Sequence, residues 1–268
     1  MVRDTKIGVI YVWPDRLLTI CRLPPNSLHD MPIKVFNTNL DQSFKITRDG
    51  HNWFECRSTL WLENETRQTY YGDSTMAVVM FEPGNADGEA VKQLMKNDNG
   101  YYHSFEHEQK TIEAFRTIYE MRPDANTAYQ IQREAMGLSA AQPANKPLDK
   151  RIVEAMKIVS AKPASDTSVE TLANRVNLSK HYFIRLFKRE TQVSYSQYRT
   201  FVRIRRSIIL LSRGYTLTRA ALEVGFTDVA HLSNAYRKVF GMKASETTKL
   251  SAGVDYFIDE RLLKECEN

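Results

Sequence analysis

The chain has 268 residues, of which 42% are hydrophobic and 26% charged, and its formal net charge is +5. Enough apolar residues are present to build packed cores, which excludes an intrinsically disordered protein. The length exceeds that of one ordinary domain, so we expect two. No apolar run reaches the roughly 18 residues that a membrane-spanning helix needs, so we expect no membrane partner.

The amino terminus and the cysteines predict a cytoplasmic protein. Asp4 and Lys6 interrupt the first apolar run, which is too short for a secretory signal. Cys21, Cys56 and Cys266 are widely separated and form no CxxC pair. We therefore expect free thiols that serve as packing residues.

The first third of the chain predicts β-structure. Seven short segments are rich in Val, Ile, Tyr, Phe and Trp and are separated by Asp, Asn, Gly and Pro. Strands at this spacing favour a small barrel or sandwich. The predicted strands cover residues 9–14, 17–24, 33–39, 42–47, 52–62, 67–73 and 76–83.

Two helices are predicted after these strands, over residues 110–121 and 128–138. Ile112, Phe115 and Tyr119 form an apolar stripe on the first helix, and Ile131 and Ala135 form one on the second. The stripe of Ile112, Phe115 and Tyr119 is a candidate dimer interface, so we expect a homodimer.

A short polar segment with two prolines follows, over residues 143–147. It is the candidate linker. The predicted organisation is therefore a first domain over 1–142, a second over 148–250, and a C-terminal tail over 251–268.

One helix-turn-helix pattern occurs twice in the second domain, over residues 172–194 and 220–244. Apolar residues of the first copy recur 48 residues later, and 49 residues later after a one-residue insertion at the turn. Two similar helices at a fixed spacing are suited to reading two successive turns of a DNA duplex.

Local rules define each copy. In the first, Thr167 and Glu170 predict a capping box, Asn177 makes the turn, and Ser179 caps the second helix. In the second, Gly225 makes the turn, and Thr227 or Asp228 is the predicted cap. The apolar positions predicted to face inward are Phe183, Leu186 and Phe187 in the first copy and Leu232, Ala235 and Tyr236 in the second.

Charge is concentrated in this domain. Residues 149–250 contain 19 Lys and Arg against 8 Asp and Glu, whereas residues 1–148 contain 16 against 19. A basic surface confined to one domain predicts salt-dependent binding to phosphates.

Residues 148–249 resemble the DNA-binding domain of the AraC/XylS family of transcription regulators. The resemblance lies in LSKHYFIRLFKRET, in YRTFVRIRRSIILL with Arg203, and in VGFTDVAHLSNAYRKVFG. It implies an all-α domain with two recognition helices in adjacent major grooves. Strands followed by a helical hairpin are similar, more weakly, to the cupin-like regulatory domain of such proteins. The expected fold is therefore α+β in two domains, a cupin-like barrel and a double helix-turn-helix domain.

The resemblance implies roles for outward-facing residues. Ile184 also fits a base contact on its own, because an exposed branched side chain can meet a thymine methyl group. Arg203 is expected to tie the two halves together. The residues implied to read bases are His181, Ile184, Arg185, Val229, His231, Ser233 and Asn234. The expected phosphate contacts are Ser179, Lys180, Lys188, Arg189, Arg205, Arg206, Thr227, Arg237 and Lys238.

The second copy departs from the family pattern. Asn234 stands where family members usually have Arg, Ala244 where they have Pro, and Thr248 where they often have Arg. We therefore expect the second half-site to be read less stringently than the first.

The function implied is a sequence-specific transcription regulator, an activator more readily than a repressor, with RNA polymerase as a partner. A small-molecule effector in the barrel is expected, and an effector-independent regulator is the alternative. The remote alternative is a metal-dependent cupin enzyme fused to a DNA-binding module. His29 lies in no recognisable metal cluster, so no metal, cofactor or catalytic residue is predicted. The candidate pocket residues are Trp13, His29, Trp53, Trp61, Tyr70 and Phe81.

Overall fold

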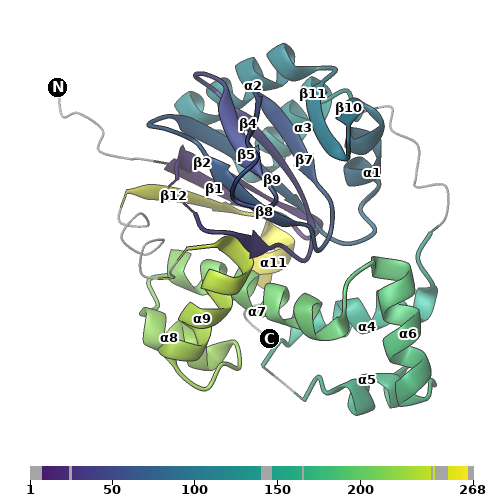
Figure 1. The fold of residues 1–268 in the computed structure, drawn as a ribbon. Coiled ribbons are helices and arrows are strands. Elements are labelled where there is room, and N and C mark those ends of the chain that lie inside the picture. Colours follow the sequence, from purple (N-terminus) through teal and green to yellow (C-terminus); the bar gives the residue numbers. More distant parts are fainter. Residues whose placement is uncertain are drawn as a thin grey trace.

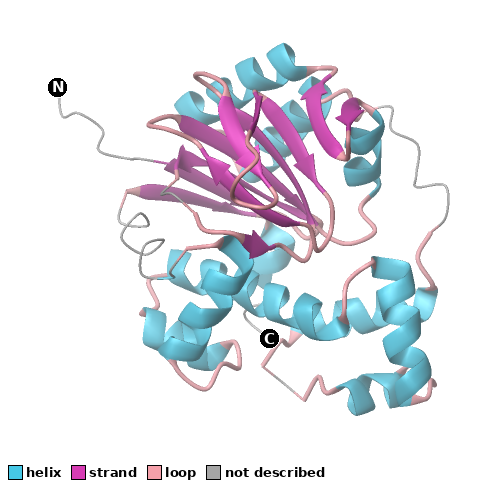
Figure 2. Cartoon of the chain, viewed as in Figure 1, coloured by secondary structure: helices cyan, strands magenta, loops and turns pink. Residues whose placement is uncertain are grey.

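The computed structural model describes residues 8–23, 26–139, 147–164, 166–242, 244 and 253–264. The strands form one half of the molecule and the helices after residue 147 form the other (Figures 1 and 2). Most of the predicted linker, over 143–146, lies outside the described residues, as does Thr248.

Two facing sheets build the N-terminal domain. The order in the large sheet is β10-β11-β7-β4-β9-β2-β1-β12, and in the small sheet it is β3-β8-β5-β6. The large sheet consists of β1 (Gly8–Val12), β2 (Arg16–Arg22), β4 (Lys34–Asn39), β7 (Ser58–Trp61), β9 (Thr75–Phe81), β10 (Met95–Asp98), β11 (Tyr101–Phe105) and β12 (Val254–Ile258). The small sheet consists of β3 (His29–Asp30), β5 (Phe44–Thr47), β6 (Phe54–Cys56) and β8 (Thr66–Tyr70).

Three helices cover the outer face of the large sheet: α1 (Ala86–Gln93), α2 (Glu108–Met121) and α3 (Ala125–Ala135). The predicted stripe of α2 lies against the sheet, because Ile112 and Phe115 belong to the core that joins strands and helices. Sequence patterns located α2 and α3 to within a few residues but missed α1, β3, β10 and β11, which are short.

The second half contains α4 (Lys150–Ala161), α5 (Val169–Arg175), α6 (Lys180–Thr191), α7 (Tyr195–Ser212), α8 (Leu217–Glu223) and α9 (Val229–Phe240). Helices α5 and α6 form the first helix-turn-helix, and α8 and α9 form the second. The long helix α7 lies between the two units (Figure 1).

The predicted tail returns to the N-terminal domain. Its strand β12 pairs in parallel with β1, from Gly8 opposite Val254 to Val12 opposite Ile258. The short helix α11 (Glu260–Lys264) follows and buries Leu262. The division of the chain into consecutive domains is therefore wrong at its end, because residues 254–258 complete the first domain's sheet. A parallel partner 246 residues away leaves no local signal in the sequence.

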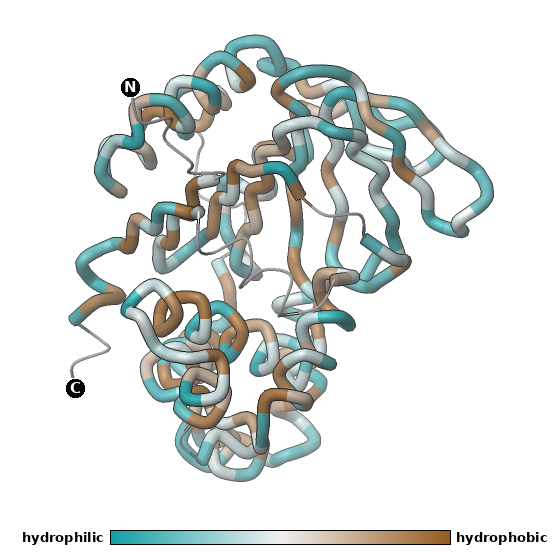
Figure 3. The backbone as a smooth tube through the Cα atoms, turned by 90° about the vertical axis from the view of Figure 1, so that its left-hand side faces the viewer, coloured by the Kyte–Doolittle hydropathy of each residue, from teal (hydrophilic) through white to brown (hydrophobic). Residues whose placement is uncertain are grey.

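The two helix-turn-helix units differ in how they are packed. The first has a core of its own, built on Phe183, Leu186 and Phe187. The second shares one continuous core with the barrel interior, in which Leu232 and Tyr236 join Leu17 and Val35. Figure 3, which views the molecule from the β12 side, shows hydrophobic segments in both the strands and the helices below them.

No helix in the described ranges is long and apolar enough to span a membrane.

Candidate DNA-binding site and interdomain cavity

The first helix-turn-helix follows the local rules except at its start. Ser168, and not Thr167, caps α5 by accepting from the Thr171 N–H. Thr167 is buried, and its hydroxyl has no hydrogen-bond partner in the described part of the chain. Asn177 makes the turn with a left-handed φ of 54°, and Ser179 caps α6 by accepting from Tyr182 N–H. Thr167 and Ser168 are adjacent and both are residue types that cap helices, so the sequence does not show which of them is the cap.

The outer face of α6 carries the predicted base-reading residues. His181 and Arg185 are exposed, and Ile184 is 42% exposed although it is apolar. The guanidinium of Arg185 lies 6.0 Å from the Tyr182 ring centroid. The positions predicted to contact phosphates on this unit are all exposed: Ser179, Lys180, Lys188 and Arg189.

The second unit is similar but less exposed. Gly225 makes the turn at φ 85°, and Asp228 caps α9 by accepting from His231 N–H at 2.7 Å. This bond lowers the pKa of the Asp228 carboxyl. His231 and Asn234 are exposed, whereas Val229 and Ser233 are half-buried. Thr227, Arg237 and Lys238 are exposed beside them.

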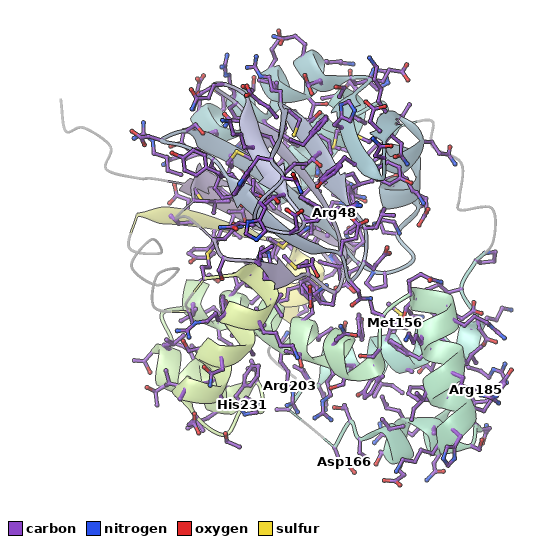
Figure 4. The ribbon with its side chains drawn as sticks, viewed as in Figure 1. Arg48, Met156, Asp166, Arg185, Arg203 and His231 are labelled. Atoms are coloured by element: carbon purple, nitrogen blue, oxygen red, sulfur yellow. The ribbon has the colours of Figure 1, made fainter. Side chains whose placement is uncertain are left out.

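Arg203 holds the two units together from the middle of α7, as predicted. Its Nε donates to the Pro163 carbonyl oxygen at 3.1 Å, and its guanidinium lies 5.9 Å from the Phe226 ring centroid. Figure 4 shows Arg203 between Arg185 on one unit and His231 on the other.

Arg205 is not a phosphate contact. It is 4% exposed and forms an ion pair with Glu82 of the N-terminal domain. It also donates to the Pro14 carbonyl oxygen and to Ser160 Oγ, both at 3.2 Å. Burial raises the pKa of the Glu82 carboxyl, and Arg205 opposes that shift. The pair fastens α7 to the barrel. Arg206, the neighbouring prediction, is half-buried.

Two segments of the barrel pair with each other beside the DNA-binding domain, residues 26–31 and 63–67. We call them the β3–β8 ribbon. His29 lies opposite Arg67 and Asp30 opposite Thr66, and Asn64 N–H donates to the Met31 carbonyl oxygen at 2.9 Å.

The β3–β8 ribbon holds the C-terminal ends of both recognition helices. At α9, the Ser27 N–H and hydroxyl donate to the Gly241 carbonyl oxygen at 3.2 and 3.1 Å. Gly241 has a left-handed φ of 70°, and a Cβ there would lie 2.6 Å from His29 Nδ1. At α6, Asn64 Nδ2 donates to the carbonyl oxygen of Gln192 at 2.9 Å. One ribbon thus contacts both helix-turn-helix units.

A cavity lies between the barrel and the DNA-binding domain. Strands β1, β2, β4 and β9 line one side, the β3–β8 ribbon lines another, and α7, α9 and β12 close it. The space is about 980 Å³ including the part open to solvent. Tyr236, Phe240, Met242, Val254 and Tyr256 bring the second half of the chain into its wall.

The comparisons with known proteins agree with this geometry. Residues 172–249 match a family described as a helix-turn-helix domain. The Msm operon regulatory protein of Streptococcus mutans is 28% identical over 232 residues, which is 80% of this chain and 84% of that protein. An HTH-type transcriptional regulator of Haemophilus influenzae is 29% identical over 102 residues, 38% of this chain and 34% of that protein.

Solved structures of ToxT from Vibrio cholerae share the whole fold. An apo form of a ToxT variant aligns with a TM-score of 0.61 at 11% identity, over 89% of this chain and 98% of that one. ToxT with an unsaturated fatty acid bound aligns with a TM-score of 0.54 at 10% identity, over 89% and 95%. This chain carries an AraC-type helix-turn-helix domain and is similar to transcriptional regulators. The Streptococcus mutans and Haemophilus influenzae relatives are both named as regulators.

Most residues predicted to form the regulator's effector pocket lie elsewhere. Trp13 and Phe81 are buried under the outer helices, and Trp61 is buried in the barrel. Trp53 and Tyr70 are 42% and 60% exposed. Of the six, only His29 lines the cavity. In β8, Arg67, Thr69 and the following Tyr71 point inward, so selecting Tyr70 chose the opposite face.

The predicted dimer stripe of the regulator is also wrong in part. Ile112 is 1% exposed and Phe115 is fully buried against the chain's own sheet, so neither is free for a second subunit. Tyr119 is half-buried.

Arg185→Ala should weaken specific DNA binding by the regulator by about 1–3 kcal/mol and relax one base position. The reason is its exposed place on the outer face of α6. Affinities for specific and scrambled duplexes measure the effect. Lys188→Ala is the matched control, and it should weaken both duplexes about equally. If Arg185→Ala also weakens both equally, Arg185 contacts phosphate and does not read a base.

Proposed function

We propose that this regulator reads promoter DNA with α6 and α9, and that a small molecule in the interdomain cavity controls this reading. The observation that carries the proposal is the composition of the cavity wall. Barrel strands supply one side, and Tyr236, Phe240 and Met242 supply part of the other. A ligand between these walls contacts the regulatory domain and the second recognition unit at once.

The contacts of the cavity give a route from ligand to DNA. His29 and Asn26 line the cavity, and Ser27 between them donates to Gly241 at the end of α9. Across the ribbon, Asn64 donates to Gln192 at the end of α6. A ligand that prefers one arrangement of the ribbon therefore shifts the arrangement of both recognition helices.

The asymmetric packing supports this mechanism. The second unit shares its core with the barrel, whereas the first has a separate core. Movement of the cavity wall therefore acts on α9 directly and on α6 through the ribbon. The ToxT structures, which hold small molecules in the same fold, agree with a ligand-controlled regulator.

Activation of transcription, contact with RNA polymerase and homodimer formation belong to the same proposal. They are supported by the resemblance to the family. A dimer would use the outward face of α2, where Met121 is 74% exposed, rather than the buried Ile112 and Phe115.

Filling the cavity tests the proposal. Thr19 lies on β2 and lines the cavity while only half-buried, so Thr19→Trp should occupy part of it. We expect affinity for specific DNA to change by about 5-fold or more, the scale of allosteric coupling. Lys45→Trp on the exposed side of β5 is the matched control and should bind DNA as the wild type does.

Two results separate the alternatives. A folded Thr19→Trp protein that binds specific DNA with altered affinity supports control from the cavity. If both tryptophan variants fold and bind like the wild type, the cavity is not coupled to DNA, and the effector-independent regulator is the better description.

A further inference from the structure

The guanidinium of Arg67 is buried at the cavity without a counter-ion. Arg67 is 3% exposed, and its Nη1 has no hydrogen-bond partner among the described residues. Its Nε donates to His29 Nε2 at 3.4 Å. Within the described residues no carboxylate pairs with it, and Glu65 pairs instead with Arg48 at 2.8 Å. Burying a cation without a partner is costly, so the arrangement needs an explanation.

His29, which accepts the hydrogen bond of Arg67, is neutral. Burial, and then the charge of Arg67, lowers the pKa of the His29 imidazole to about 4. His29 Nδ1 lies 2.7 Å from the Ser27 carbonyl oxygen, so Nδ1 carries the proton and Nε2 accepts from Arg67. Burial also lowers the pKa of Arg67, to about 10, which leaves it charged at neutral pH. Arg67 is therefore the one permanent charge in the described lining of the cavity.

The rest of the cavity is mostly apolar. Asn26, Thr69 and Tyr71 surround Arg67 at the ribbon and bond to one another, since Asn26 accepts from Thr69 N–H and donates to the Tyr71 hydroxyl. The opposite walls carry mainly hydrophobic side chains, and their polar groups belong to Thr19, Asn37 and the hydroxyls of Tyr236 and Tyr256. The apolar lining residues are Ile10, Leu17, Val35, Val78, Met80 and, from the DNA-binding half, Met242.

We propose that this cavity binds an amphipathic monocarboxylate, with its carboxylate paired to Arg67 and its apolar part against β2, β9 and α9. The inference rests on the proposed function and names the chemical class of the effector. A carboxylate matches the planar donors of a guanidinium. A sugar would leave many hydroxyl groups unpaired against the apolar walls. A phosphate monoester would bring a second negative charge that no described lining residue neutralises.

Pairing of the ligand carboxylate with Arg67 would also change the hydrogen bonds that lead to α9. Arg67 Nε donates to His29, His29 Nδ1–H donates to the Ser27 carbonyl oxygen, and Ser27 donates to Gly241 at the end of α9. A carboxylate that pairs with Arg67 competes for the donor that now bonds His29. Arg67 and His29 thus connect the ligand to the hydrogen bond between Ser27 and Gly241 at the end of α9.

The test compares acids with alcohols of equal length. Straight-chain monocarboxylates from hexanoate to hexadecanoate, together with 4-phenylbutyrate, are titrated by calorimetry against the full-length protein and matched with their alcohols. We expect the best acid to bind about tenfold or more tightly than its alcohol. Arg67→Gln should remove that preference, Arg67→Lys should retain part of it, and the exposed charge variant Arg22→Gln should retain all of it.

A spectroscopic readout reports the place of binding. The chain has three tryptophans, and ¹⁵N-labelled indoles give one N–H signal each. The Trp61 ring centroid lies 5.8 Å from the Arg67 guanidinium, and no described residue bonds to its Nε1. Trp13 Nε1 is bonded to the Ala125 carbonyl oxygen under the outer helices and serves as the internal control. The acid should shift the Trp61 signal and leave the Trp13 signal in place.

Each outcome decides a separate claim. Equal binding of acid and alcohol that Thr19→Trp blocks would overturn the role of Arg67 and leave the cavity as the effector site. An acid preference that persists in Arg67→Gln would overturn the assignment as well. If no acid in the series binds more tightly than its alcohol, the ligand class is wrong. Failure of the proposed function is seen separately, in DNA binding by Thr19→Trp.

Discussion

Arg205→Ala should lower the free energy of unfolding by about 3–5 kcal/mol, because it leaves the buried Glu82 carboxylate without its partner. Arg205 is 4% exposed and bonds Glu82, the Pro14 carbonyl oxygen and Ser160. The Tyr198 hydroxyl also bonds Glu82. Since these groups come from both halves of the chain, the loss should loosen the contact between barrel and α7. Denaturant unfolding of the full chain measures it.

The double variant Arg205→Met, Glu82→Leu should recover much of that loss, because it removes both charges together. Lys188→Ala, an exposed basic residue on α6, should change stability by less than about 0.5 kcal/mol. DNA binding gives an independent readout. If Arg205→Ala leaves stability unchanged and reduces the salt dependence of DNA binding by one phosphate, Arg205 contacts DNA after all.

Phe187→Ala should cost about 3–5 kcal/mol and unfold the first helix-turn-helix before the rest of the chain. Phe187 is fully buried and packs on the rings of Phe183, Tyr195 and Tyr198, with centroids 5.4 to 5.8 Å apart. This unit has a separate core, so no side chain of the barrel can fill the space that the lost ring leaves. Thermal unfolding followed by circular dichroism should show an early transition.

Ile184→Ala is the matched control for Phe187→Ala, because Ile184 is an apolar residue of the same helix whose side chain is exposed. Ile184 is 42% exposed, so we expect a stability change below about 0.5 kcal/mol together with weaker DNA binding. A near-neutral effect of Phe187→Ala combined with a large loss in Ile184→Ala would mean that the inward and outward faces of α6 are reversed.

Local rules predicted the DNA-binding half well. Asn177, Ser179 and Gly225 have the turn and cap conformations that their residue types favour. The inward residues of α6 and α9 followed from helical spacing. The one local error, at Thr167 and Ser168, arose because both residues can cap a helix and only the backbone path distinguishes them.

The features that could not be predicted from the sequence depend on partners far away in the chain. Arg205 is a basic residue in a basic helix, which favours the prediction of a DNA contact. Its actual partner is the buried Glu82, 123 residues away, and nothing near Arg205 in the sequence indicates that pairing. Strand β12 has a partner at the opposite end of the chain. The residues predicted to line the pocket are mostly aromatic, but Trp13 and Phe81 face the outer helices. Arg67 could have been found, because a charged residue at an inward position of a strand is unusual.

Selection from a random pool of duplex DNA, followed by footprinting of the enriched sequence, tests the central claim most directly. Two recognition helices at the ends of α7 predict one enriched sequence protected over about two helical turns. Its affinity should exceed that for scrambled DNA at every salt concentration, more stringently in the half read by α6. Equal binding to both DNAs that disappears at modest salt, with no sequence enriched, would contradict base reading by these helices.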